Sequence, residues 1–303
     1  MKTTVTESLK ALLGEGNVLL DEPMSAHTTF RTGGPADLLV TPGDTDQLRE
    51  VLKICREEDV PFFVIGNGSN LLVSDKGYRG VIIRICHAMD KITVDGTLIR
   101  AGAGTMLVTV ARAAMEHSLT GLEFASGIPG TLGGAVFMNA GAYGGEMKQV
   151  VKRVAAMTYD GHIEVFTGEQ MDFGYRTSLV QKRNMIVLEA DLALQEGDQE
   201  AILSRMNELR DQRNAKQPLE LPSAGSTFKR PEGYFAGKLI QDAHLAGASV
   251  GGAGVSEKHC GFVVNNGGAS SSDVAALISY VQDKVYEDSG VRLEPEVRFL
   301  GEF

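Results

Sequence analysis

The stretch that decides the fold is LEFASGIPGTLGGAVFMNAGAYGG, residues 122–145. It holds too many glycines for a regular helix or strand and too many apolar residues for a loop in solvent. We therefore expect a buried loop that contacts a ligand through its backbone and runs into a short helix over residues 133–139. From Gly127 to Gly134 the missing side chains would let several backbone N–H groups approach one anionic group.

A second glycine loop precedes this stretch. Residues 61–66 read PFFVIG, an apolar run that predicts a buried strand, and the loop Gly66-Asn-Gly-Ser-Asn70 begins at the end of that run. Small residues at the carboxyl end of a strand can gather N–H groups around a pyrophosphate. By itself this loop is weak support, because it is neither a Rossmann nor a Walker A motif and most such loops are plain turns. Two glycine loops in one domain suit one extended dinucleotide.

Periodicity predicts the remaining elements. Apolar residues at helical spacing predict helices over residues 1–20, 45–60, 106–117, 198–217 and 272–288. Apolar and β-branched runs predict strands over residues 81–85, 91–94, 97–101, 185–194, 261–265 and 292–300, and a hairpin around Asp160-Gly161. Thr45 is expected to cap its helix, and Asp95-Gly96 to turn another hairpin. A shift to charged residues after residue 197 places a domain boundary near Asp191, and the larger part divides near residue 80.

The composition limits the class of protein. The chain has 303 residues, of which 43% are hydrophobic and 22% are charged, as in an ordinary globular protein. A net charge of −10 argues against binding to nucleic acid, which needs a basic surface. No apolar run could span a bilayer and residues 1–17 lack a signal-peptide core, so we expect no membrane insertion and a cytoplasmic location. Cys55, Cys86 and Cys260 are spaced for neither a disulfide framework nor a metal site.

With both glycine loops in view, the sequence resembles the flavoprotein family that includes vanillyl-alcohol oxidase and, within it, the enolpyruvyl-sugar reductases of cell-wall synthesis. The segments GNGSN, SGIPGTLGG and NAGAYGG carry this resemblance. Residues 29–34, TFRTGG, also match the family's first domain. The resemblance implies an α+β protein, with a two-part FAD-binding domain of the vanillyl-alcohol-oxidase type over residues 1–191. A smaller α+β substrate-binding domain would follow over residues 192–303.

The resemblance also implies the ligands. FAD would bind noncovalently, with its pyrophosphate against the first loop and its isoalloxazine ring near the second. NADPH would be the co-substrate, and a UDP-sugar would be the substrate. The enzyme would be a monomer or a weak dimer and would act in peptidoglycan synthesis. The implied contacts to FAD are Gly66, Asn67, Gly68, Ser69, Asn70, Leu71, Gly127, Ile128, Pro129, Thr131, Gly133, Gly134 and Asn139.

Three further segments match the enolpyruvyl reductases: GYRTS at 174–178, AGSTFKRP at 224–231 and LEPEVRF at 293–299. The resemblance assigns the chemistry to Arg176, Ser226 and Glu296. Reduction of a vinyl ether that carries a carboxylate needs a hydride at one carbon and a proton at the next, so negative charge develops in between. A guanidinium can stabilise that charge. A hydroxyl can deliver the proton as general acid, and a carboxyl group can stabilise the enol or order a water.

Each of these residues also has an ordinary explanation. Arg176 alone would be a surface arginine, Ser226 a capping serine and Glu296 a solvent-facing carboxylate. The five segments together, in the family's order, favour the catalytic interpretation. The basic residues near Ser226, including Arg230, suit a diphosphate in an otherwise acidic protein, and Asn266 is another polar candidate. The expected substrate contacts are Tyr175, Lys229, Lys238, Gln241 and Asn265.

Several alternatives stay open at this point. An oxidase that uses oxygen would keep both glycine loops but would need no proton-donating serine. A noncatalytic nucleotide-binding module would use the loops as a sensor. The short run from Gly174 to Ala190 resembles the family's shorter type, which lacks a tyrosine lid over the substrate. His259 and Cys260, adjacent in an expected strand, would face opposite ways, so we interpret them as structural rather than as a reactive pair.

Overall fold

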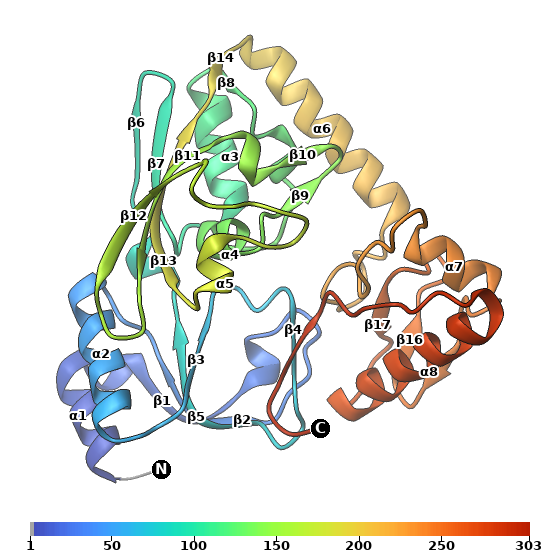
Figure 1. The fold of residues 1–303 in the computed structure, drawn as a ribbon, viewed down its shortest axis with the longest axis horizontal. Helices are drawn as coiled ribbons and strands as arrows, with labels where there is room; N and C mark the ends of the chain where they lie inside the picture. Colours follow the sequence, from blue (N-terminus) through green and yellow to red (C-terminus); the bar gives the residue numbers. More distant parts are fainter. Residues whose placement is uncertain (1–2) are drawn as a thin grey trace. The chain divides into compact units, whose positions relative to one another are not determined.

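The computed structural model describes residues 3–303 and divides them into two compact units (Figure 1). The first unit consists of the residues up to Leu19, Leu38–Asn67 and Gly80–Arg213. The second consists of Leu20–Asp37, Gly68–Arg79 and Asn214–Phe303. The chain therefore passes between the units several times, and the first glycine loop itself is divided between Asn67 and Gly68.

The division along the chain differs from the expected boundary near Asp191. Helix α6 (Gln199–Lys216) lies almost wholly in the first unit, because Ile202 and Leu209 are buried and Met206 packs against that unit's core. Strand β14 (Gln195–Glu196) pairs with β8 (Leu119–Thr120) and holds the start of the helix there. The shift to charged residues thus marks a mostly exposed helix of the first unit that buries two residues, Ile202 and Leu209.

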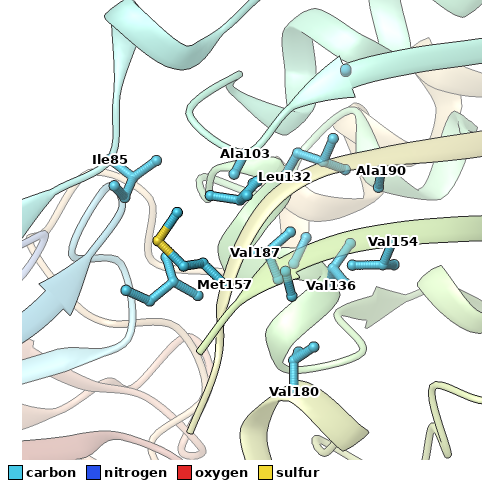
Figure 2. Close-up of a cluster of buried hydrophobic side chains, with 14 of the residues drawn as sticks. Ile85, Ala103, Leu132, Val136, Val154, Met157, Val180, Val187 and Ala190 are labelled. Carbon is cyan, nitrogen blue, oxygen red and sulfur yellow. The ribbon is translucent and has the colours of Figure 1, made fainter. Parts of the chain in front are cut away.

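A five-stranded antiparallel sheet organises the first unit. Its strands, in spatial order, are β12 (Ile163–Thr167), β11 (Val151–Met157), β13 (Ile186–Ala193), β7 (Leu98–Gly102) and β6 (Ile92–Asp95). Helix α4 (Leu132–Phe137) packs against β13 and β7, and α3 (Leu107–Glu116) packs against α4. Figure 2 shows Leu132 and Val136 of α4 among Val154, Val187 and Ala190 of the sheet, all of them buried. The helix that follows the second glycine loop is therefore fixed by the core.

A four-stranded sheet contains the strand that feeds the first glycine loop. Its order is β1 (Val18–Pro23), β2 (Pro35–Val40), β5 (Tyr78–Arg84) and β3 (Phe62–Ile65), with β3 parallel to β5. Helices α1 (Thr3–Leu13) and α2 (Thr45–Glu57) pack on each other through buried leucines. The expectation that Thr45 caps α2 is wrong. Asp44 is the cap, because its backbone is extended and its Oδ1 accepts a hydrogen bond from the Gln47 N–H at 2.8 Å.

Short elements complete the first unit. They are strands β9 (Gly141–Ala142) and β10 (Gly145–Glu146), helix α5 (Leu179–Lys182), and 3₁₀ turns at Glu15–Asn17, His87–Met89, Glu123–Ala125 and Met147–Gln149. The expected helix over residues 106–117 and the hairpin around Asp160-Gly161 are confirmed by α3 and by β11 with β12. Gly96 has a positive φ of 56° in the turn between β6 and β7, which confirms that expected hairpin too.

The second unit contains a three-stranded sheet covered by a long helix. The strands are β15 (Ser249–Val250), β16 (Ala253–Val255) and β17 (Val263–Asn265), and helix α8 (Ser271–Ser289) packs on them and on α7 (Ala236–Asp242). Strand β4 (Leu71–Val73) pairs in parallel with β18 (Arg298–Leu300), and a 3₁₀ turn spans Met24–Ala26. This pairing brings an early segment and the end of the chain into one unit.

Two expectations about this unit are wrong. Only Arg298–Leu300 of the expected strand over residues 292–300 is a strand, because Pro295 has no N–H to continue a ladder. His259 and Cys260 lie in the turn between β16 and β17, not in a strand. Their structural interpretation nevertheless fits, since Nδ1 of His259 accepts a hydrogen bond from the Gly261 N–H at 3.1 Å and Cys260 is a buried free thiol. Within residues 3–303 no helix is both long and apolar enough to cross a lipid bilayer.

A buried carboxylate ties three strands of the larger sheet together. Asp191 of β13 accepts hydrogen bonds from Nε and Nη2 of Arg100 on β7, at 2.6 and 2.9 Å. On its other side lies Arg153 of β11, with Nη1 3.6 Å from Oδ2. The side chain of Asp191 is 5% exposed, and its hydrogen bonds and ion pair with Arg100, followed by Arg153, lower its pKa.

We expect Asp191→Asn to lower the free energy of unfolding by about 1–2 kcal/mol at neutral pH, a value reduced for the exposure of the arginines. A depressed pKa in the folded state contributes stability above the unfolded-state value near 4, and this contribution is lost as the pH falls through that range. Urea denaturation at pH 7 and pH 3.5 should therefore show the difference from wild type shrinking at the lower pH. The exposed Asp288→Asn is the control. A pH-independent difference would contradict this assignment.

Candidate active site

The two glycine loops meet within the first unit, as one shared dinucleotide site would require. Nδ2 of Asn67 donates a hydrogen bond to the carbonyl oxygen of Pro129 at 2.6 Å. A Cβ at Gly66 would overlap Oγ1 of Thr131, so only glycine permits this approach. Loops that are 62 residues apart in the sequence are thus held side by side at the carboxyl end of β3.

The backbone N–H groups of these loops divide into two sets. Those of Leu132 and Gly133 donate to the carbonyl oxygens of Thr105 and Ala103, at 2.8 and 2.9 Å, and so anchor the start of α4. Within residues 3–303, no protein acceptor is hydrogen-bonded by the N–H groups of Gly66, Asn67, Gly127, Gly130 or Thr131. The row of free amides is therefore shorter than the sequence suggests, and it includes residues of both loops.

A cofactor with phosphates and a flat ring fits this part of the first unit. The unbonded N–H groups suit phosphate oxygens. Gly134 is not crowded, since a Cβ there would make only an ordinary contact with Oγ1 of Thr131 at 3.6 Å. Oγ1 of Thr105, next to the second loop, is buried without a hydrogen-bond partner among the described residues. Backbone amides, absent side chains and an unsatisfied hydroxyl are the features that a dinucleotide would use.

The other end of α4 anchors the loop that carries Arg176. Nδ2 of Asn139 donates to the carbonyl oxygen of Gly174 at 2.9 Å, and Oγ of Ser178 donates to that of Phe137 at 2.7 Å. Both sides of the GYRTS segment are therefore tied to the carboxyl end of this helix. Because α4 has six residues, the loop and the glycine cradle are separated by about 9 Å of helix.

Asn139 itself is nearly saturated by protein contacts. It is buried, with a left-handed φ of 44°, and Nδ2 also donates to Glu146 at 2.9 Å. Its Oδ1 accepts the N–H of Lys148 at 2.9 Å. The hydrogen bond from Lys148, and then that from Asn139, lower the pKa of Glu146, with Arg176 contributing through its charge. Asn139 thus positions the Arg176 loop, and its expected contact with FAD stays a prediction.

Arg176 occupies a strained backbone position. Its φ is 54°, in the left-handed region that non-glycine residues avoid. Nη2 donates to the carbonyl oxygen of Gly141 at 3.3 Å, and the guanidinium carbon lies 5.1 Å from the ring centroid of exposed Tyr175. Such strain persists where the surroundings enforce it, and it gathers at functional sites.

In the second unit, Thr227 presents Ser226. Thr227 is fully buried, and its N–H donates to Gly261 O at 2.8 Å while its Oγ1 accepts from Val263 N–H at 2.9 Å. Gly225 has a positive φ of 75°, which turns the chain just before Ser226. Ser226 is exposed, and its hydroxyl is hydrogen-bonded to no other described residue. A fixed backbone therefore carries a hydroxyl that is available to a ligand.

The same backbone brings Glu296 beside Ser226. The Glu296 N–H donates to the carbonyl oxygen of Thr227 at 2.8 Å, and Phe228 forms an antiparallel bridge with Pro295. Nδ2 of Asn70 donates to the carbonyl oxygen of Glu296 at 3.0 Å. Ser226 and Asn70 lie 70 and 226 positions before Glu296 in the sequence, respectively. Two predicted catalytic residues and the end of the first glycine loop therefore meet in one unit.

The remaining FAD candidates have mixed positions. Gly68 has a φ of 61°, and a Cβ there would overlap the carbonyl oxygen of His27. Leu71 is buried in β4, and Ile128 is half-buried against the first unit's core. Ser69 lies in the turn before β4, in the second unit with Gly68.

The expected substrate contacts of the second unit lie on three segments of the chain. Lys229 is paired with Glu294 at 3.1 Å beside the Ser226 segment. Lys238 pairs with Asp242 along α7, and Gln241 is exposed on the same helix. Asn265 is buried, with Nδ2 donating to Phe30 O at 3.0 Å and Oδ1 accepting from two backbone N–H groups. Its side chain has a structural role, and its contact with substrate stays a prediction.

Arg213 of α6 is a candidate that the sequence did not single out. A Cβ at Gly127 would lie 3.1 Å from its Nη1, so the guanidinium touches the second glycine loop. Among the described residues it has no hydrogen-bond or carboxylate partner, and burial lowers its pKa. A half-buried cation with no carboxylate partner among the described residues suits an anionic ligand group. Only the long-range packing of α6 could have revealed it.

Comparison with known proteins gives two matching family models. Residues 36–167 match a model described as an FAD-binding domain. Residues 217–300 match one described as the C-terminal domain of UDP-N-acetylenolpyruvoylglucosamine reductase. The second match contains Ser226 and Glu296, and the first contains both glycine loops.

Relatives match along nearly the whole chain. The UDP-N-acetylenolpyruvoylglucosamine reductase of Alkaliphilus oremlandii is 52% identical over 301 residues, which cover 99% of each chain. The crystal structure of that reductase from Thermus caldophilus is 37% identical with a TM-score of 0.81, and the match covers 94% of this chain and 98% of the other. A structure of alkyldihydroxyacetonephosphate synthase, 14% identical over 65% of this chain and 41% of its own, has a TM-score of 0.51 and so shares only the fold. The expected fold class is confirmed.

Proposed function

The chain belongs to the UDP-N-acetylenolpyruvoylglucosamine reductase family, and on that premise we propose that Arg176, Ser226 and Glu296 carry its reaction. It is an FAD-dependent oxidoreductase that reduces UDP-N-acetylglucosamine enolpyruvate to UDP-N-acetylmuramate in peptidoglycan synthesis. We further propose NADPH as the hydride donor, a cytoplasmic location, and a monomer or weak dimer.

One observation carries the proposal. Helix α4 begins in the glycine cradle and ends at the two anchors of the Arg176 loop, Asn139 with Gly174 and Ser178 with Phe137. The helix is buried against the sheet, so the cradle and the loop keep a fixed spacing. A guanidinium at a fixed distance from a cofactor site is what stabilisation of a developing charge requires.

The unbonded amides support a position for the cofactor. Gly66 and Asn67 on the first loop, with Gly130 and Thr131 on the second, would hold the pyrophosphate. Ile128 through Gly134 would face the isoalloxazine ring, and the contacts of FAD with Gly68 to Leu71 are part of the same proposal. FAD, when bound, supplies the hydride that reaches the methylene carbon of the substrate.

The chain's own residues complete the reduction. Arg176 stabilises the negative charge that spreads into the substrate carboxylate, an effect worth about 3–4 kcal/mol for one positioned donor. Ser226 then donates its proton to the neighbouring carbon as general acid. Glu296 stabilises the enol form or orders a water. Arg213 offsets negative charge beside the second loop, and Lys229 and Lys238 attract the diphosphate.

Family membership decides between the three functions that the sequence left open. The proposal predicts a yellow protein whose steady-state oxidation of NADPH depends on the UDP-enolpyruvyl sugar. The measurement is NADPH absorbance with product identification by mass spectrometry. Oxygen consumption with a sugar lactone and no response to the UDP-sugar would point instead to an oxidase, and a colourless protein that binds a mononucleotide to a sensor.

We expect Gly66→Ala to abolish most FAD binding. The added Cβ would collide with Oγ1 of Thr131 and push the two loops apart. The measurement is the ratio of flavin to protein absorbance after purification, followed by titration with FAD. Gly16→Ala is the matched control, because no atom lies within 4 Å of its Cβ position. Retention of wild-type FAD affinity by the Gly66 variant would show that the cofactor does not use this cradle.

A further inference from the structure

A cavity of about 530 Å³ lies in the first unit, at the opposite end of β3 from the first glycine loop. The end of α2 and the start of β3 line one side of it, and the turn between β11 and β12 lines the other. Strand β3 begins at Phe62 in the cavity, whereas the glycine loop follows Ile65, about 10 Å further along the strand. The volume is typical of a site for a small molecule, and none of the lining residues takes part in the proposed reaction.

The two sides of this cavity are fixed to each other. Nε of Arg49 on α2 donates a hydrogen bond to the carbonyl oxygen of Gly161 in the turn at 3.1 Å, and Figure 1 shows this end of the hairpin beside α2. The rings of Phe62 and Tyr159 pack edge to face, with their centroids 4.8 Å apart. Cys55 lines the cavity as a buried thiol, and burial raises its pKa to about 11, so it adds no charge at neutral pH. The cavity is therefore preformed and has an aromatic wall.

Asp59, which lines this cavity, occupies a backbone position that usually belongs to glycine. Its φ is 52°, and its N–H donates to Arg56 O at 3.3 Å. The N–H of Val60 donates to Cys55 O at 2.8 Å. These two hydrogen bonds form a Schellman motif, whose left-handed residue is most often glycine because glycine has no Cβ. The presence of aspartate here indicates a use for its carboxylate beyond ending the helix.

Two charged side chains of opposite sign in this cavity are unpaired. Within residues 3–303, neither the Arg56 guanidinium nor the Asp59 carboxylate makes a hydrogen bond or an ion pair, although both line the cavity. The carboxylate of Asp160, on the facing turn, already has partners, because Oγ1 of Thr158 donates to it and Nε2 of His162 lies 3.6 Å from its Oδ2. The cavity therefore offers one free cation and one free anion beside its aromatic wall.

These groups select the charge of the ligand. A phosphate would meet two carboxylates and only one cation, so the charges disfavour a nucleotide. A purely apolar molecule would desolvate both free charges without giving either a partner. A zwitterion supplies a carboxylate for Arg56 and an ammonium group for Asp59, and the negative end of the α2 dipole also favours the ammonium group.

We propose that this cavity binds a free α-amino acid with an aromatic or large apolar side chain. The carboxylate of the ligand pairs with Arg56, its ammonium group pairs with Asp59, and its side chain packs on Phe62 and Tyr159. This site goes beyond the proposed function and does not depend on it.

The test uses L-phenylalanine as the probe and tryptophan fluorescence of the purified holoenzyme as the readout. The chain contains no tryptophan, so Tyr159→Trp places a single indole in the wall of the cavity. We expect its emission to change saturably as L-phenylalanine is added. Tyr280→Trp is the matched control, because Tyr280 on α8 is 43% exposed and Tyr159 is 44% exposed. Its emission should not change, and calorimetry on wild type should give the same Kd as the Tyr159 variant.

Changes to either charge test the pairing. Arg56→Gln and Asp59→Asn should each raise the Kd for L-phenylalanine about tenfold or more, as for loss of one hydrogen bond to a charged group, with FAD content and turnover unchanged. N-acetyl-L-phenylalanine, which lacks the ammonium group, and L-phenylalaninamide, which lacks the carboxylate, should bind wild type more weakly by a similar factor. Arg112→Gln, at an exposed position on α3, and Asp21→Asn, at a φ of 48°, are the controls and should keep the wild-type Kd.

Absence of saturable binding of L-phenylalanine to wild type would overturn the proposal. Wild-type affinity in both Arg56→Gln and Asp59→Asn would also overturn it, because the amino acid would then bind elsewhere. If the amide binds as tightly as the amino acid, Arg56 does not pair with a ligand carboxylate, and the assignment to a zwitterion is wrong.

Discussion

Ser226→Ala is expected to stop transfer to the enolpyruvyl substrate while leaving reduction of the flavin by NADPH intact. The reductive half-reaction needs no proton from this hydroxyl, whereas the oxidative half-reaction cannot finish without one at the carbon next to the hydride acceptor. Positioned general acids contribute about 10²–10⁴-fold, so we expect reoxidation to slow by that factor. The fold should survive, because Ser226 is exposed and buried Thr227 makes the anchoring hydrogen bonds.

Stopped-flow absorbance of the flavin separates the two half-reactions. The enzyme is first reduced with NADPH and then mixed with the UDP-enolpyruvyl sugar. Ser204→Ala, an exposed serine on α6, should match wild type in both steps. Ser226→Cys, which keeps a donor, should recover part of the rate. Reoxidation of the alanine variant at the wild-type rate would remove Ser226 from the mechanism, and slow reduction by NADPH would mean that the substitution acts on the flavin site.

The glycine loops could be predicted because the pattern that indicates them involves only residues close together in the sequence. A run of glycines after a strand indicates that backbone groups rather than side chains face a ligand. The hydrogen bond between Asn67 and Pro129 agrees with one shared site. Long helices with clear spacing, such as α8, were predictable for the same reason. The number of free amides could not be predicted. The N–H groups of Leu132 and Gly133 donate hydrogen bonds to Thr105 and Ala103, which lie more than twenty residues away in the sequence.

The supporting residues of the site could not be predicted. Nothing in the sequence around Asn139 says that its amide holds Gly174, and nothing near Thr227 says that it fixes Glu296. Both roles arise from pairings between distant segments. The boundary near Asp191 was expected from a change in charge, but burial of Ile202 and Leu209 keeps α6 in the first unit. That packing also brings Arg213 to Gly127.

Arg176 offers a test in which activity and stability move apart. Its φ of 54° is a conformation that costs a non-glycine residue about 1–2 kcal/mol. Glycine would remove that cost, although it loses about 0.5–1 kcal/mol to its greater freedom in the unfolded chain. A residue chosen only for the backbone would be glycine here. We therefore attribute the retention of arginine to its guanidinium.

We expect Arg176→Gly to lower kcat by about 10²–10³-fold, the effect of removing one preorganised donor from a developing charge. The free energy of unfolding should stay the same or rise by up to about 1 kcal/mol. Steady-state kinetics with the UDP-sugar and chemical denaturation measure the two quantities. Arg176→Ala should lose the same activity but be the less stable of the two, because it keeps the strain.

Ser118→Gly is the matched control, because Ser118 has nearly the same φ of 56° and lies just after α3, outside both glycine loops. It should gain as much stability as Arg176→Gly and keep full activity. Loss of stability in Arg176→Gly would mean that the contact with Gly141 O, rather than catalysis, retains the arginine. Full activity in that variant would show that the charge on the substrate is stabilised by another cation. If both glycine variants are as stable as expected and only one is inactive, the backbone strain at residue 176 is maintained for the reaction.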